Sequence, residues 1–143
     1  MSTPPRVYTP GNRVEVMGYE PGFIGSYYEA TILTVLDDGR YEVIYKNLVE
    51  DEETKIPLKE YLRPQDLRPR PPPVREAIEF KLTQHVDVFI NEGWWIGAVA
   101  AKDMDRSVYL VYFESTGKAA EYDSSLVRVH QELINGLWYR SDP

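Results

Sequence analysis

The two halves of the chain repeat one another, and this repeat constrains the fold more than any other feature of the sequence. Three segments of the first half match three of the second: Arg13–Val16 with His85–Val88, Tyr27–Ile32 with Trp94–Val99, and Tyr41–Tyr45 with Tyr109–Phe113. Differences in length fall only between the matched segments, where loops tolerate them best. The sequence therefore predicts one small structural unit built twice.

A proline-rich segment, Arg68–Pro73, separates the halves. Proline fixes φ and lacks a backbone donor, so such a run forms a stiff, extended connector. Leu67–Pro69, just before the prolines, gives a fourth and weaker match with Val127–Val129. We predict a first domain over residues 1–73 and a second over residues 74–143.

Each half contains four or five short segments rich in Val, Ile and Tyr, bounded by turn residues, which is typical of β-strands. The expected strands lie near 13–17, 28–36, 40–46, 54–58, 66–69, 85–90, 94–102, 107–114, 119–123 and 126–129. Asp37–Arg40 predicts a hairpin turn, and Lys102–Arg106 is its counterpart. Leu58–Leu62 favours a single helical turn. Strands so short and evenly spaced predict an all-β fold of small, strongly bent barrels.

The chain of 143 residues carries a formal charge of −7 and contains no cysteine. The negative charge favours cationic partners, because an acidic field attracts them, whereas a protein that binds duplex DNA usually presents a basic face. The missing cysteines exclude disulfides and suit a reducing cytosol or nucleus. No apolar run is long enough to span a membrane. Catalytic and phosphate-binding motifs are lacking, and His85 and His130 lie in different halves, so we expect a protein that is not an enzyme and has no metal or cofactor.

Aromatic residues recur at matching strand ends in the two halves. The rings and neighbouring carboxylates that we predict at the barrel mouths are Tyr19, Tyr28, Tyr45 and Asp51 in the first half, and Phe89, Trp95, Phe113, Glu114, Tyr122 and Asp123 in the second. Two to four rings around a slot attract a cation, and a methylated ammonium suits such a slot. The competing interpretation is that these rings belong to the core, as most strand aromatics do. The acidic run Glu50–Glu53 is either a solvated loop or the border of a cation site.

Strand alternation separates the neighbours Trp94 and Trp95. Trp95 shares its face with Gly97 and Val99, so we expect it to point inward and Trp94 to cover either the other barrel or the outer surface. In the C-terminal tail, Asn135-Gly136 predicts a turn. Trp138 is too apolar to remain in water without cost, so we expect it to pack on one of the barrels or on the junction between them.

The residues that carry a family resemblance extend over about 11–140. In the first half they are Val14–Val16, Gly22–Ile32, Tyr41–Leu48, Pro57–Glu60 and Leu67–Pro72; in the second they are Val86–Phe89, Gly93–Gly97, Val111–Glu114, Arg128–His130 and Asn135–Trp138. Taken together they resemble a tandem pair of Agenet domains, the plant branch of the Tudor-like Royal group. One departure is Tyr27-Tyr28, where Agenet units often have Trp followed by Phe.

The resemblance implies two bent five-stranded barrels packed together that bind methylated lysine or arginine. Similar tandem Tudor units suggest a cage of Trp95, Phe113 and Tyr122 in the second barrel, and single Tudor domains suggest a ring at Tyr19 or Phe89. Similar plant proteins read histone H3 dimethylated on lysine 9 in heterochromatin, which implies a nuclear protein. Which barrel holds the working cage stays open at this point.

The leading hypothesis is a chromatin reader that binds the histone H3 tail and is a monomeric module of a larger protein. The alternatives are binding of methylarginine or an unmodified basic peptide, a nucleic-acid-binding module, and a structural scaffold whose rings all lie in the core. The net charge argues against nucleic acid, although Arg63, Arg68, Arg70 and Arg75 cluster near the connector.

Overall fold

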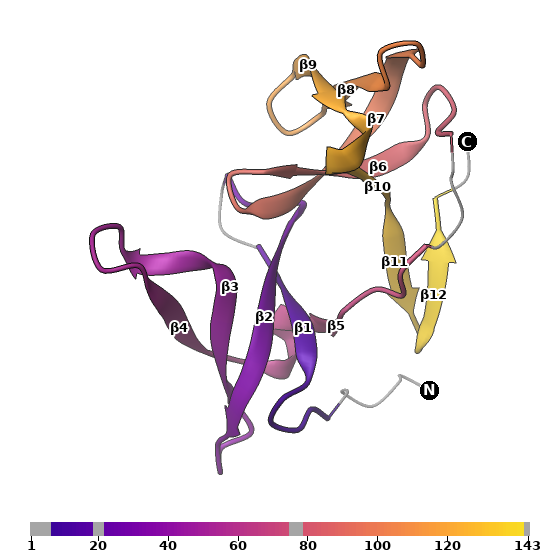
Figure 1. Ribbon diagram of the computed structural model, residues 1–143. Helices are drawn as coiled ribbons and strands as arrows, with labels where there is room; N and C mark the ends of the chain where they lie inside the picture. The colour runs from indigo at the N-terminus through magenta and orange to yellow at the C-terminus, as the bar shows by residue number, and fades with distance from the viewer. Residues whose placement is uncertain (1–6, 19–21, 75–78, 142–143) are drawn as a thin grey trace. The chain divides into compact units, whose positions relative to one another are not determined.

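The computed structural model describes residues 7–18, 22–74 and 79–141, and its regular structure consists of β-strands and two short 3₁₀ turns (Figure 1). The chain divides into two compact units, residues 1–70 and 71–143, so the division follows Arg70, slightly before the predicted boundary at residue 73. The all-β prediction is confirmed.

Nowhere in the described ranges is there a helix that could cross a bilayer.

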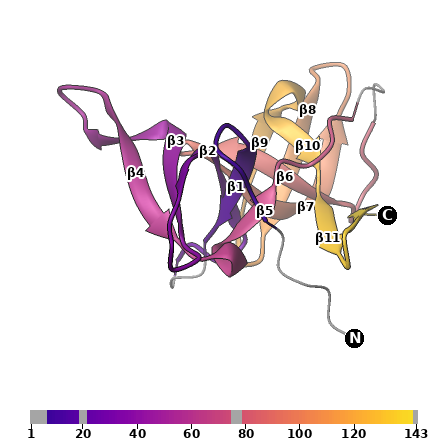
Figure 2. The ribbon, with the colours of Figure 1, turned by 90° about the horizontal axis from the view of Figure 1, so that it is seen from below.

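The first unit is an antiparallel sheet in the order β4-β3-β2-β1-β5. Its strands are β1 (Arg13–Met17), β2 (Ser26–Val35), β3 (Tyr41–Asp51), β4 (Ile56–Leu62) and β5 (Leu67–Pro69), and a 3₁₀ turn over Pro64–Asp66 precedes β5. Alternate residues such as Val14, Ile32 and Val43 form its core and are almost completely buried. Figure 2 shows β3 and β4 projecting from the unit as a long hairpin.

The second unit repeats this arrangement in the order β9-β8-β7-β6-β10. Its strands are β6 (His85–Ile90), β7 (Gly93–Asp103), β8 (Val108–Phe113), β9 (Lys118–Asp123) and β10 (Val127–Val129), with a 3₁₀ turn over Ser124–Leu126. The core consists of Phe80, Val86, Val88, Val99, Tyr109, Val111, Phe113 and Val129. The predicted repeat is therefore present in three dimensions.

The predicted helical turn at 58–62 is wrong, because these residues belong to strand β4. The expected strand at 54–58 begins later and continues to Leu62. Leu, Lys and Glu favour helix locally, but cross-strand pairing with β3 overrides this weak preference. In this pairing Leu62 lies opposite Tyr41, and Lys59 lies opposite Ile44.

A lead-in segment before each sheet extends the repeat beyond the segments matched in the sequence. The backbone N–H of Tyr8 donates to the Tyr41 hydroxyl at 3.1 Å, and that of Phe80 donates to the Tyr109 hydroxyl at the same distance. The ring centroids of these pairs lie 5.4 and 5.3 Å apart in edge-to-face geometry. The hydroxyl of each buried tyrosine thus accepts a hydrogen bond from the segment that precedes the first strand of its unit.

The C-terminal tail forms a separate hairpin of β11 (Gln131–Ile134) and β12 (Leu137–Arg140), drawn in yellow in Figure 1. Asn135 and Gly136 have φ values of 50° and 80°, as a two-residue turn of type I′ requires. The predicted turn is therefore confirmed. Trp138 is half-buried and lies opposite Leu133 in the hairpin.

Candidate functional site

Three of the predicted rings lie in or against the core of the second unit. Phe113, at the end of β8, is 8% exposed and belongs to the core, and the half-buried Trp95 and Tyr122 pack against the same core cluster. The rings of Phe113 and Tyr122 stand at 88° to one another with centroids 5.9 Å apart. We call Trp95, Phe113 and Tyr122 the aromatic triad.

Two local features hold the triad in place. The indole N–H of Trp95 donates to the carbonyl of Ile90 at 3.1 Å, which orients this ring. Gly97 follows Trp95 on the inward side of β7, and a Cβ there would lie only 3.1 Å from Cε1 of Phe113 and 2.5 Å from Cγ1 of Val111. The missing side chain at Gly97 therefore leaves the space that the edge of the Phe113 ring occupies.

Exposed carboxylates follow two of the triad rings in the sequence. Glu114 comes directly after Phe113, and Asp123 comes directly after Tyr122. The backbone N–H of Ser125 donates to Asp123 at 2.9 Å, and this hydrogen bond lowers the pKa of the Asp123 carboxyl. The Asp123 carboxyl therefore carries a negative charge at neutral pH.

The corresponding rings of the first unit lie deeper. Tyr28 and Tyr45 are 9% and 5% exposed, and burial raises the pKa of both phenols. In the second unit Tyr122 lies opposite Tyr109, whereas in the first unit Leu62 lies opposite Tyr41. The position of the third ring is thus aliphatic in the first unit. The sequence pattern did not reveal this difference, because the expected strand ended at residue 58 and β4 continues to Leu62.

The remaining predicted site residues do not join either group of rings. Asp51 is exposed at the end of β3 and accepts a hydrogen bond from the backbone N–H of Glu53 at 2.8 Å. Phe89 is adjacent to Trp94, with ring centroids 5.1 Å apart and an angle of 60°, on the face of β6 and β7 opposite to Trp95. Tyr19 lies outside the described residues.

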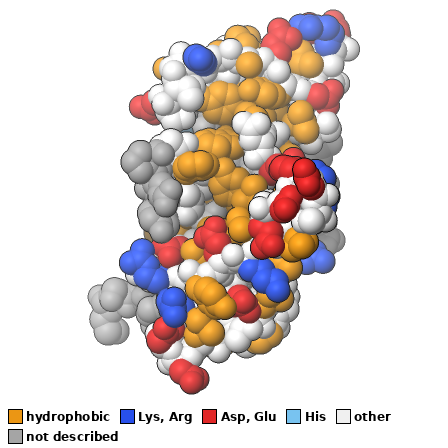
Figure 3. Space-filling model, turned by 90° about the vertical axis from the view of Figure 1, so that its left-hand side faces the viewer, with side chains coloured by type: hydrophobic (Ala, Val, Ile, Leu, Met, Phe, Trp, Pro, Cys, Tyr) orange, Lys and Arg blue, Asp and Glu red, His pale blue; other side chains and the backbone are white. Residues whose placement is uncertain are grey.

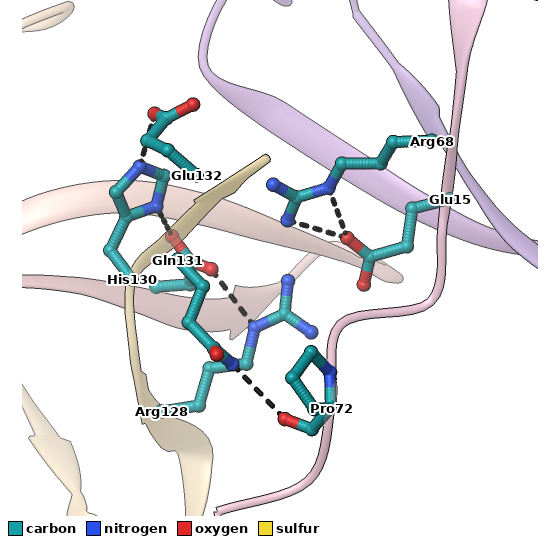
Figure 4. A network of polar contacts seen from close by, with 8 residues as sticks. Glu15, Arg68, Pro72, Arg128, His130, Gln131 and Glu132 are labelled. Atoms are coloured by element: carbon teal, nitrogen blue, oxygen red, sulfur yellow. Dashed lines mark hydrogen bonds and ion pairs between the residues drawn. The ribbon is translucent and has the colours of Figure 1, made fainter. Parts of the chain in front are cut away.

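The outward face of the first unit carries a buried ion pair between Glu15 and Arg68 (Figure 4), and the Arg68 guanidinium also stacks on an aromatic ring. The guanidinium of Arg68 donates from Nε and Nη2 to Oε1 of Glu15 at 2.9 and 2.7 Å, and both side chains are almost completely buried. The same guanidinium lies 3.7 Å from the centre of the Tyr27 ring. Tyr27 is therefore the partner of Arg68, while its neighbour Tyr28 points inward.

The second unit repeats this arrangement. Nε of Arg128 (Figure 4) donates to Oδ2 of the buried Asp87 at 2.9 Å. The Arg128 guanidinium lies 4.2 Å from the centre of the Trp94 ring. The other oxygen of Asp87 lies 2.7 Å from Nδ1 of His130, whose Nε2 lies 2.6 Å from Glu132. The predicted separation of Trp94 from Trp95 is confirmed, and the matched carboxylates and arginines of the repeat were the signal for these pairs.

Two units, each an antiparallel sheet of five strands in the same order, define a Tudor-like fold, a class of domain that serves as a binding module. The family model described as "Agenet domain" matches residues 11–72. Residues 11–72 therefore form an Agenet domain, and with its repeat the chain is similar to a tandem pair of such units. Agenet and Tudor-like domains are chromatin-associated binding modules.

Two curated Arabidopsis thaliana proteins are similar to almost the whole chain. Protein AGENET DOMAIN (AGD)-CONTAINING P1 is 33% identical over 94% of the chain, and DUF724 domain-containing protein 3 is 29% identical over 90%. The chain spans 27% of the length of the first relative and 19% of the second. In each case the chain is therefore similar to one region of a much longer protein.

Solved structures with tandem Agenet domains resemble the fold. The crystal structure of Arabidopsis thaliana AGDP1 AGD34 matches with a TM-score of 0.81 and 28% identity, covering 92% of this chain and 88% of that one. The crystal structure of ADCP1 tandem Agenet domain 3-4 matches with a TM-score of 0.78 and 27% identity, covering 92% and 86%. The predicted tandem Tudor-like fold is thus confirmed.

Proposed function

We propose that the chain is a nuclear chromatin reader that binds methylated lysine on the histone H3 tail, most specifically dimethylated lysine 9. In this proposal the aromatic triad of the second unit forms the cage. The observation that supports it best is the perpendicular pair of Phe113 and Tyr122, in the same cluster as Trp95, because two rings at a right angle form two walls of a cage.

The chemistry of the triad suits a methylated ammonium. Ring faces carry negative electrostatic potential and attract a cation, and each good contact contributes about 0.5–2 kcal/mol. A methylated ammonium is weakly hydrated, so it loses less hydration than lysine when it enters the cage. A dimethyl group keeps one N–H, which could donate to Glu114 or Asp123, whereas a trimethyl group has none. A carboxylate at the cage would therefore favour the dimethyl form.

The first unit lacks the third ring, which favours the second unit as the site of the cage. Leu62 takes the position of Tyr122, and the phenols of Tyr28 and Tyr45 are nearly buried. The overall charge of −7 suits a tail rich in Lys and Arg. Figure 3 shows acidic side chains exposed near apolar ones.

Titration of the full chain with H3 peptides tests the proposal. We expect micromolar binding to the peptide dimethylated at lysine 9. Tyr122→Leu gives the second unit the residue that the first unit has, so we expect it to weaken binding about tenfold, as the loss of a cation–π wall predicts. Tyr112→Leu is the matched control, because Tyr112 is 43% exposed on the neighbouring strand and lies outside the core cluster.

Comparison with unmodified and methylarginine peptides separates the alternatives. Equal binding of methylated and unmodified H3 peptides would replace the methyl-lysine proposal with recognition of a basic peptide. Stronger binding of a methylarginine peptide would change the ligand but retain the cage. If Tyr122→Leu and Trp95→Ala both bind as wild type while Tyr28→Ala does not, the working cage lies in the first unit.

A further inference from the structure

We propose that the outward face of the first unit holds a second binding site, which accepts a phosphate monoester carried by a peptide side chain. A hollow of about 320 Å³ opens there across strands β1, β2 and β3. Arg13, Arg70 and Lys46 bring positive charge to its border, and Glu29 is the only acidic residue among those that line it. We call it the Arg13–Arg70 hollow.

The two arginines occupy directly opposite positions where β1 runs beside β5. Val14 pairs with Pro69, and the backbone N–H of Arg70 donates to the carbonyl of Arg13 at 3.3 Å. Like charges on directly opposite residues of antiparallel strands repel one another. Arg13 and Arg70 therefore repel each other at the border of the hollow. An anion bound between the two guanidiniums would attract both and offset this repulsion.

The other charges of the hollow leave this pair available. Lys46 forms an ion pair with Glu29 at 3.3 Å, so these two charges offset each other. Arg13 and Arg70 are both exposed, and neither guanidinium has an ion-pair partner among residues 7–18, 22–74 and 79–141. Two guanidiniums offer paired N–H donors that match the oxygens of a phosphate.

The rest of the lining indicates a ligand with one charged group. Thr31 adds a hydroxyl between the strands, and Ile44 and Tyr45 supply apolar surface. An extended nucleic acid gains its affinity from many phosphate contacts along a basic track. The chain carries a net charge of −7, so a polyanion that extends beyond the two arginines would meet repulsion. A single phosphoserine or phosphothreonine avoids most of that cost.

The site is independent of the aromatic triad, because all its residues belong to the first unit. It therefore stands or falls separately from the proposed reading of methyl-lysine. A partner that carries a methylated lysine and a phosphorylated side chain would bind the second unit through the lysine and the first unit through the phosphate.

The test uses the full chain labelled with ¹⁵N and a capped peptide of glycine and alanine with one central phosphoserine. We expect the phosphopeptide to shift the amide resonances of Thr31 and Ile44, and the same peptide with serine to leave them unchanged. The double variant Arg13→Gln/Arg70→Gln should weaken binding at least about tenfold, because hydrogen bonds to charged groups are the strong ones. Arg40→Gln is the matched control: this exposed arginine pairs with Asp38 in the β2–β3 turn and does not line the hollow.

Each alternative result overturns the proposal. Equal binding of the serine peptide would show that the phosphate is not recognised. Equally tight binding of inorganic phosphate would identify an adventitious ion only. Tighter binding of a strand of ten thymidines, lost in the double variant, would assign the face to nucleic acid. Wild-type affinity in the double variant would place the phosphate elsewhere. Because both arginines are exposed, we expect the double variant to fold, and an unchanged dispersion of its amide spectrum checks this.

Discussion

The guanidinium of Arg68 lies 3.7 Å from the centre of the Tyr27 ring and is held there by Glu15. The ring and the carboxylate together orient one of the most buried charges of the first unit. The second unit makes the same arrangement from Arg128, Trp94 and Asp87. In the pairs Tyr27-Tyr28 and Trp94-Trp95, the first ring thus stacks on the arginine of the ion pair. The second ring points to the inward face of its unit.

Glu15→Gln should destabilise the protein strongly. The amide keeps the size of the side chain but leaves the buried charge of Arg68 uncompensated, and loss of one partner of a buried pair costs about 3–5 kcal/mol. Urea unfolding measures the change in the free energy of unfolding. Glu42→Gln, which removes a carboxylate from the exposed side chain pair with Thr34, is the control and should cost less than about 1 kcal/mol. Equal effects of the two variants would contradict the role of Glu15.

Two arginines close together in the chain should behave in opposite ways. Arg68→Gln removes a buried partner of Glu15 and should destabilise the fold, for the same reason as the variant above. Arg70→Gln removes one of two like charges on opposite residues, so the free energy of unfolding should stay the same or rise by a few tenths of a kcal/mol. Thermal unfolding at low ionic strength compares the two, and a clear loss of stability for Arg70→Gln would show a structural role for that side chain.

His130 should make stability depend on pH. Burial by itself would lower the pKa of His130, but the hydrogen bond and charge of Asp87, joined by those of Glu132, outweigh it and raise the pKa above its ordinary value. A group whose pKa is higher in the folded state stabilises the fold fully below its unfolded pKa, near 6.5, and the benefit is lost as pH rises through the folded pKa. Arg128 also faces Asp87 and keeps that carboxylate paired on both sides of the transition.

The measurement is urea unfolding of wild type and His130→Gln from pH 5.5 to 8.5. We expect the difference between them to be largest at the acidic end and to decline as pH rises. An NMR titration of the His130 ring should give a midpoint above 6.5. A midpoint below 6.5 would mean that burial, and not the two carboxylates, decides the protonation of this ring.

Gly97→Ala should disturb the aromatic triad, because Gly97 lies on β7 and directly faces Phe113 of the neighbouring strand β8. The new methyl group would come within 2.5 Å of Cγ1 of Val111 and 2.9 Å of the Tyr112 carbonyl, so the neighbouring strand must move. Overpacking of this kind costs about 1–3 kcal/mol. Peptide binding should weaken as well, because Phe113 loses its position. Ala100→Val, at an exposed position of the same strand, is the control and should change neither stability nor binding.

The repeat in the sequence predicted most of the strands, because each segment was visible from alternation among near neighbours. The prediction failed at residues 58–62, where local composition favours a helical turn and pairing with β3 imposes a strand. That error also concealed the difference between the units, since the position of Leu62 opposite Tyr41 defines what corresponds to Tyr122.

By itself, the amino-acid sequence determined a doubled all-β fold, an acidic surface and the set of rings available to a cage. Only the tertiary structure decided that Phe113 and Tyr122 meet at a right angle, that Phe89 faces away with Trp94, and that Arg13 and Arg70 border one hollow. The physical reason is that alternation along a strand depends on adjacent residues. The meeting of side chains from separate strands depends instead on register, which hydrogen bonds between distant segments establish.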